Sequence, residues 1–166
     1  MNKVIETIKK RRSIRHYIEK EIPEEILRDI VDCGRLAPTG YNNQPWSFVV
    51  VTDKNIREQV ADAAGSGDFI REAGACVAVF CDKNAETALE DASAATENMM
   101  IAAEAYNLGT CWVNSYKKGH TDEVEQILNC PENKELMTLF AVGYYENNNK
   151  DVSKKSLSEV MKWQTF

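Results

Sequence analysis

The sequence predicts an α+β domain in which helices cover both faces of a central sheet. Four stretches are almost wholly apolar and rich in β-branched residues, as expected of strands: SFVVVT (47–52), ACVAVFC (75–81), TCWVNSY (110–116) and LMTLFAV (136–142). Strands that are apolar along their whole length are typical of sheets buried on both faces. Segments with helical spacing of apolar residues lie between them. No internal repeat, low-complexity stretch or linker divides the 166 residues, so we expect one domain, 1–166.

The predicted helices follow from apolar spacing and from the residues that begin and end helices. A short apolar stripe predicts a helix over residues 2–11 that ends before Ser13. Pro23 suits the first position of a second helix, whose apolar positions continue towards Gly34. Further helices are expected near residues 54–64, 85–107 and 120–129.

The helix predicted at 85–107 is dense in alanine, and Gly109 is placed to end it. One of its faces carries Ala88, Ala92, Ala95, Met99, Ala102 and Tyr106. Small side chains let two helices approach closely, so we expect this helix to be central and buried. Packing within one subunit and packing against a second copy explain the face equally well.

The last part of the chain is polar after Gly143 and then becomes apolar again. The apolar positions of this tail are Leu157, Val160, Met161, Trp163 and Phe166. A free tail would not normally leave a tryptophan and a phenylalanine exposed to water. We therefore expect the tail to dock, either on its own domain or on a partner.

Composition excludes several classes of protein. The chain has 26 acidic and 20 basic residues, a net charge of −6, whereas a general nucleic-acid binder is normally basic. No apolar run approaches the roughly 18 residues that span a bilayer. The start MNKVIETIKK is amphipathic and charged, so we do not expect it to act as a signal peptide. The five cysteines include no CxxC pair, and Cys76, Cys81 and Cys111 lie inside apolar runs, so we expect these three to be core thiols. With two histidines in the chain, we expect no metal site. These features predict a cytoplasmic protein without nucleic-acid or membrane partners.

A cluster of positive charge stands out in this acidic chain. RRSIRHY (11–17) places three arginines around Ser13. The planar donors of arginine and a serine hydroxyl suit a phosphate monoester, and Lys154 and Lys155 supply further cations near the end of the chain. A solvated helix end or a nucleic-acid patch would have a similar pattern.

The loop APTGYNNQPW (37–46) is rich in amide side chains. Asn42, Asn43 and Gln44 each bring two amide donors and one carbonyl acceptor, which suits the edge of a polar heterocycle. Gly40 lets the backbone come close to a ligand, and the flanking prolines stiffen the loop. A polar surface loop would contain the same residue types.

Four segments in this order resemble the nitroreductase family of flavin mononucleotide (FMN) oxidoreductases. They are RRSIRHY, APTGYNNQPWSFVVV, NLGTCWVNSY and SKKSLSEV after FAVGYYE, and together they span nearly the whole chain. The resemblance implies a mixed, mostly antiparallel sheet flanked by helices. It also implies a homodimer with FMN at the interface and a C-terminal arm, residues 145–166, exchanged between subunits. The chain is shorter than many relatives, which have an extra helical stretch over the active site.

The resemblance also implies roles for particular residues. Arg11, Arg12 and Ser13 match the segment that holds the phosphate and ribityl end of FMN, and Arg15 lies by the pyrimidine edge. The remaining positions that match cofactor-binding residues are Pro38, Thr39, Gly40, Asn42, Gln44, Asn114, Ser115, Lys154 and Lys155. Among these, the backbone at Asn114 and Ser115 would present an amide to the flavin N5. Tyr41, at the tip of the loop, is the candidate to touch a substrate.

The activity that the resemblance implies is electron transfer from NADH or NADPH, through the flavin N5, to nitroaromatic, quinone or similar electron-poor acceptors. Donor and acceptor would occupy the same flavin face in turn, which gives ping-pong kinetics. We expect no catalytic protein residue beyond electrostatic support from Arg15. The alternatives are another flavin reaction, such as reductive dehalogenation or flavin fragmentation, and a non-catalytic flavin-binding or electron-carrier protein.

Overall fold

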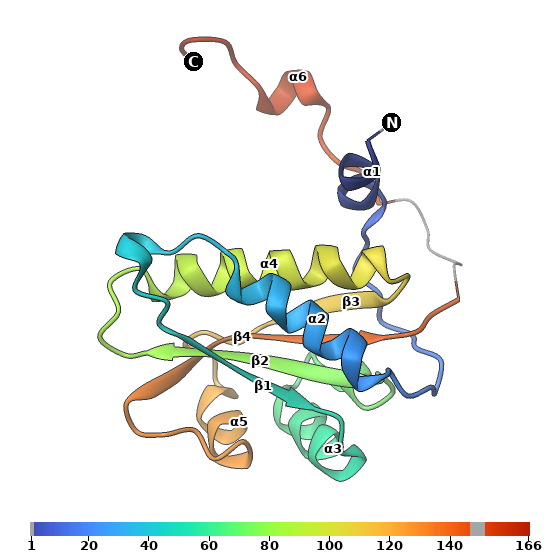
Figure 1. The fold of residues 1–166 in the computed structure, drawn as a ribbon, viewed down its shortest axis with the longest axis vertical. Coiled ribbons are helices and arrows are strands. Elements are labelled where there is room, and N and C mark those ends of the chain that lie inside the picture. The colour runs from blue at the N-terminus through green and yellow to red at the C-terminus, as the bar shows by residue number, and fades with distance from the viewer. Residues whose placement is uncertain (1, 147–151) are drawn as a thin grey trace.

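Four strands form one antiparallel sheet in the order β1-β2-β4-β3 (Figure 1). The structure is a computed structural model that describes residues 2–146 and 152–166. Residue 1 and residues 147–151 lie outside this description, and residues 147–151 belong to the predicted arm. The strands are β1 (Trp46–Val51), β2 (Ala75–Asp82), β3 (Gly109–Asn114) and β4 (Lys134–Gly143). In the described chain, the one parallel pairing is an isolated bridge between Ser13 and Thr110, so the sheet is less mixed than expected.

Helices lie on both sides of the sheet (Figure 1). They are α1 (Lys3–Lys10), α2 (Glu24–Arg35), α3 (Lys54–Ala63), α4 (Ala88–Ala105), α5 (Thr121–Ile127) and α6 (Leu157–Val160), with short 3₁₀ turns η1 (Gly40–Asn42) and η2 (Asp68–Ile70). Helices α2 and α4 cover one face, and α3 and α5 cover the other. No helix within residues 2–146 and 152–166 combines the length and the apolarity needed to cross a bilayer.

The central strand β2 packs against different helices on its two faces. Val77 and Val79 belong to the apolar cluster with α2 and α4, whereas Cys76 and Ala78 belong to the cluster with α3 and α5. Every second residue of a strand points to the same face, so this alternation confirms that the strand is covered on both sides. Cys76 and Cys81 are core residues as predicted, and burial raises the pKa of both thiols to about 12.

Two predicted helix ends are wrong by a few residues. Pro23 is the N-cap of α2 and not its first helical residue. Helix α4 ends at Ala105, and the chain turns at the left-handed Asn107 (φ 57°), where the N–H groups of Asn107 and Leu108 donate to the carbonyls of Glu104 (3.0 Å) and Ala103 (2.9 Å). Gly109, expected to end this helix, instead begins β3 and pairs with Gly143.

The alanine-rich face of α4 packs within the subunit along most of its length. Ala88, Ala92, Ala95 and Met99 are buried, Ala102 is half-buried, and Tyr106 remains 40% exposed. Helix α2 crosses α4 closely at Gly34, where a Cβ atom would lie 2.6 Å from the Met99 Cγ. Close helix packing in one chain therefore accounts for the small residues up to Met99.

Replacing Gly34 by valine is expected to lower the free energy of unfolding by about 1–3 kcal/mol, because the new side chain must displace buried Met99. Urea unfolding followed by circular dichroism measures this change. Gly119→Val is the matched control, since no atom of the described residues lies within 4 Å of a Cβ built there. Equal stability of the two variants would contradict the close crossing.

Helix α1 and the C-terminal tail, residues 152–166, extend away from the body of the domain (Figure 1). Val4, Ile5 and Ile8 form an exposed apolar stripe on α1, which has no buried residue. Every residue of the described tail is exposed, and Trp163 is 75% exposed. Within residues 152–166 the expected docking on the chain's own domain is therefore not observed.

Candidate functional site

The arginine segment, residues 11–17, follows α1 and is held against the start of β3. The Ile14 N–H donates to the Thr110 carbonyl (2.9 Å), and the Tyr17 hydroxyl donates to the Ile14 carbonyl (2.7 Å). Ile14 is buried against Gly109, where a Cβ atom would lie 2.5 Å from the Ile14 Cγ1. Because neighbouring side chains of an extended chain alternate, burial of Ile14 leaves Ser13 and Arg15 exposed on the opposite side.

Arg11 and Arg12 use their guanidinium groups differently. The Arg12 Nη1 donates to the carbonyls of Lys9 (2.7 Å), Lys10 (3.1 Å) and Arg11 (2.9 Å), which caps the C-terminus of α1. The Arg11 Nε lies 3.4 Å from the Glu97 Oε1, but its Nη1 is buried and has no hydrogen-bond partner among the described residues. A buried donor without a partner costs about 1–3 kcal/mol. An anionic ligand would supply the missing acceptor, so the segment fits a phosphate group.

Arg15 lies close enough to β3 to influence its cysteine. Burial raises the pKa of the Cys111 thiol, and the positive charge of Arg15 opposes this rise in pKa. Cys111 is 1% exposed, which confirms the prediction of a core residue. The guanidinium of Arg15 therefore lies near the start of β3, on the exposed side of the segment.

The amide-rich loop has an unusual backbone. Tyr41 (φ 53°), Asn42 (φ 58°) and Gln44 (φ 48°) all adopt left-handed conformations. Each such conformation costs a non-glycine residue about 1–2 kcal/mol, and such residues are common at functional sites. The Gln44 N–H donates to the Thr39 Oγ1 (3.2 Å), while the side chains of Tyr41, Asn42 and Gln44 are exposed.

The end of β3 is fixed by residues from the next turn. Asn114 is exposed, whereas Ser115 is buried and its hydroxyl donates to the Val113 carbonyl (3.1 Å). The Thr121 hydroxyl donates to the Ser115 carbonyl, and the His120 Nε2 lies 3.4 Å from the Ser115 Oγ. Sequence reasoning missed both supporting residues, because this turn shows no recognisable motif.

The arginine segment and the amide-rich loop lie at opposite ends of α4 in one chain (Figure 1). The Lys10 Nζ is 3.3 Å from the Glu104 Oε1 near the C-terminal end, and the Gly40 N–H donates to the Asp91 Oδ1 (3.2 Å) near the N-terminal end. Asp91 and Glu104 are 13 residues apart, which is about 20 Å of helix. The two halves of the predicted site therefore do not meet within a single chain. Lys154 and Lys155 are exposed in the tail.

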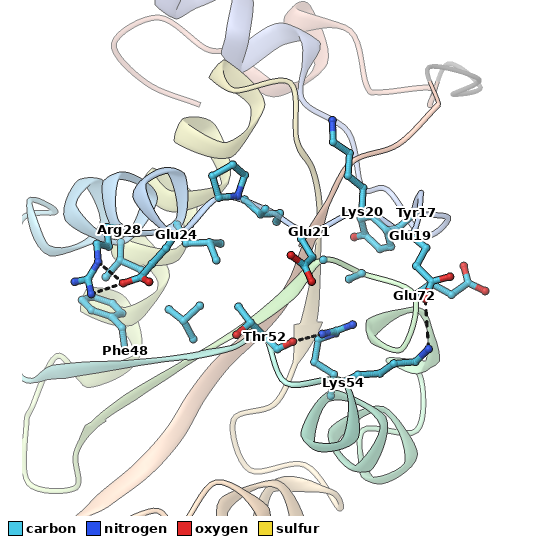
Figure 2. Close-up of a pocket in the computed structure, with 18 of the residues that line it drawn as sticks. Tyr17, Glu19, Lys20, Glu21, Glu24, Arg28, Phe48, Thr52, Lys54 and Glu72 are labelled. Carbon is cyan, nitrogen blue, oxygen red and sulfur yellow. Dashed lines mark hydrogen bonds and ion pairs between the residues drawn. The ribbon is translucent and has the colours of Figure 1, made fainter.

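A groove of about 1910 Å³ lies along β1, and its lining residues include none of the predicted site residues (Figure 2). Phe48 and Val50 of β1 line it together with Leu27 of α2. Its charged rim includes Arg28, whose Nε donates to the Glu24 Oε1 (2.7 Å). Since β1 pairs only with β2 among the described strands, the groove follows the free edge of the sheet.

Comparison with known proteins places the chain in a family. A model of the nitroreductase family matches residues 8–67 and 65–144. A relative from Archaeoglobus fulgidus, provisionally described as an NADH dehydrogenase/NAD(P)H nitroreductase, is 31% identical over 150 residues, which cover 87% of this chain and 86% of that protein. A solved structure with the same provisional description, from Bacteroides thetaiotaomicron, has a TM-score of 0.92 at 26% identity and covers 99% of both chains. An FMN-dependent nitroreductase from Clostridium difficile R20291 has a TM-score of 0.89 at 25% identity, covering 98% of this chain and 99% of that one. Because the family model spans well over half of its residues, this chain belongs to the nitroreductase family.

Proposed function

We propose that the protein is an FMN-dependent oxidoreductase that takes electrons from NADH or NADPH and passes them to nitroaromatic, quinone or similar electron-poor acceptors. The observation that carries the proposal is the Nη1 of Arg11, which is buried and finds no hydrogen-bond partner within residues 2–146 and 152–166, in the segment where the family resemblance expects a phosphate. Membership of the nitroreductase family and the similarity to an FMN-dependent nitroreductase support the same cofactor.

In this proposal the chain binds and orients the cofactor with residues from several elements. Arg11, Arg12 and Ser13 hold the phosphate end, with Lys154 or Lys155 as a further cation. The flavin ring lies against Pro38, Thr39, Gly40, Asn42 and Gln44, and the backbone at Asn114 and Ser115. Bound FMN supplies two-electron chemistry at its N5 atom, which amino-acid side chains lack. Tyr41, which is 92% exposed at the tip of the loop, contacts the substrate.

Arg15 supports the chemistry electrostatically by placing a positive charge beside the electron-rich pyrimidine edge of the ring. Replacing Arg15 by alanine is expected to lower the midpoint potential of bound FMN by on the order of 30 mV, equivalent to about 1.4 kcal/mol for two electrons. Spectroscopic titration against reference dyes measures the potential. His16→Ala, at the neighbouring exposed position, is the control, and an unchanged potential in Arg15→Ala would remove Arg15 from this role.

A second copy of the chain completes the site in this proposal. The arginine segment and the amide-rich loop are separated by most of the length of α4, so one chain offers FMN only half of its predicted contacts. Two chains that pack through the α4 side can bring the arginine segment of one against the loop of the other. The exposed stripe of Val4, Ile5 and Ile8 on α1 gives apolar surface for such a dimer.

The exchanged arm has a matching surface on the partner. The groove along β1 offers Phe48, Val50 and Leu27 to the apolar side chains of the tail, and its free strand edge offers backbone hydrogen bonds. The tail exposes Leu157, Trp163 and other apolar side chains when only one chain is considered. We assign the groove to the tail of a second copy, which would bury both surfaces together.

Binding of FMN and its reduction test the proposed function directly. The purified protein is expected to bind FMN and to be yellow, and NADH or NADPH is expected to bleach the bound flavin in a stopped-flow experiment. Turnover on a panel of nitro compounds and quinones then identifies the acceptor class. A folded protein that does not bind FMN would overturn the proposal. Bound FMN that neither nucleotide reduces would favour a non-catalytic flavin protein.

A further inference from the structure

A buried carboxylate connects the amide-rich loop to α4. Asp91, the fourth residue of α4, is 4% exposed. Its Oδ1 accepts the N–H of Gly40 (3.2 Å), and its Oδ2 accepts the hydroxyl of Thr87 (2.9 Å). No lysine or arginine forms an ion pair with Asp91 in the part of the chain that the structure describes. A buried carboxylate is unfavourable unless hydrogen bonds compensate for the lost water, so these two donors account for its retention.

The loop backbone lies directly on the first turn of α4. A Cβ atom at Gly40 would be 2.7 Å from the Thr87 Oγ1, so only glycine allows this approach. The left-handed residues Tyr41 and Asn42 follow at once, and Gln44 is left-handed as well. Such conformations persist only where surrounding contacts fix them. Asp91 fixes the beginning of this stretch, and the bond from the Asp82 N–H to the Pro45 carbonyl (3.2 Å) fixes its end.

We infer that Asp91 is a positioning residue for flavin binding: through Gly40 and Thr87 it fixes the backbone from which Asn42 and Gln44 meet the ring. The inference rests on the proposed function. Asp91 is buried beneath the loop and acts through Gly40, so its role is to set the geometry of the amides before the ligand arrives. Preorganisation of this kind reduces the ordering that binding would otherwise require.

Affinities for FMN and riboflavin, measured by quenching of flavin fluorescence, test the inference. Asp91→Ala is expected to raise the Kd for both ligands by the same factor, about 10- to 100-fold, because both contain the ring. Asp91→Asn keeps one acceptor oxygen and is expected to recover part of the affinity. Thr87→Val, which removes only the hydroxyl, is expected to give a smaller loss of the same kind. Glu90→Ala, at the exposed neighbouring position, is the control and is expected to leave both values within about twofold.

The outcomes separate this inference from the proposed function. A wild-type protein that binds no flavin overturns both. If the wild-type protein binds flavin and the flavin affinity of Asp91→Ala is within twofold of the wild-type value, only the positioning role is overturned. A loss confined to FMN, with riboflavin unchanged, also overturns it, because that pattern belongs to the phosphate end. If Asp91→Ala fails to fold, Asp91→Asn and Thr87→Val provide the same comparison, and unchanged flavin affinity in both contradicts the inference.

Discussion

Replacing Arg11 by alanine is expected to weaken FMN binding about 10- to 100-fold while the fold stays intact. A hydrogen bond to a charged group contributes about 1.5–3 kcal/mol, which corresponds to this range. The Arg11 Nη1 is buried and has no partner in the described part of the chain, so the substitution breaks no hydrogen bond observed there. The ion pair of Arg11 with Glu97 is partly exposed and accounts for no more than about 1 kcal/mol of stability.

Fluorescence titration with FMN measures the affinity, and thermal melting of the flavin-free protein measures stability. Riboflavin, which lacks the phosphate, should bind wild type and Arg11→Ala alike. Lys83→Ala removes the same charge from an exposed position outside the predicted site and outside the groove along β1, and is expected to leave the FMN affinity unchanged. An Arg11→Ala protein that binds FMN as tightly as wild type would contradict the assignment of the phosphate to this segment.

Replacing Trp163 by aspartate is expected to convert the proposed dimer largely to monomers. Trp163 is 75% exposed in one chain, so a charged residue there should not harm the fold of that chain. If the side chain is buried against a second copy, its loss costs about 2 kcal/mol or more, at least a 30-fold rise in the dimer Kd. FMN affinity should fall together with dimerisation, because the two halves of the site lie about 20 Å apart along α4 within a chain.

Sedimentation velocity over a range of concentrations measures the oligomeric state. Ile56→Asp places the same charge on α3, which covers the opposite face of the sheet from α4, and Ile56 is also an exposed apolar residue. The control is expected to behave like wild type. A Trp163→Asp protein with the wild-type molecular mass would show that the tail does not hold two copies together.

The regular elements could be predicted from the sequence because local patterns determine them. The continuous apolar runs predicted all four strands, and their burial on both faces follows from the same pattern in β2. The errors lie at boundaries, where tertiary contacts decide. Gly109 was expected to end α4, but Asn107 adopts the left-handed conformation first, and Gly109 is needed in β3 beside buried Ile14.

The residue types of the candidate site could be predicted from the sequence, but their arrangement in space could not. Arg11, Ser13 and Arg15 could be singled out because several cations in an acidic chain need an explanation. Asp91 and Thr121 could not be singled out, because each contacts the site from another element through one or two hydrogen bonds that no sequence motif predicts.

The sequence by itself determined the strands and helices, the family, and the residues with the chemistry to bind a phosphate and a polar ring. These depend on spacing along the chain and on side-chain chemistry, which are local properties. Only the tertiary structure decided that the arginine segment and the amide-rich loop lie at opposite ends of α4, and that α1 and the tail expose apolar surface. Distances between segments far apart in sequence depend on how the helices pack on the sheet. This packing cannot be read from the sequence alone.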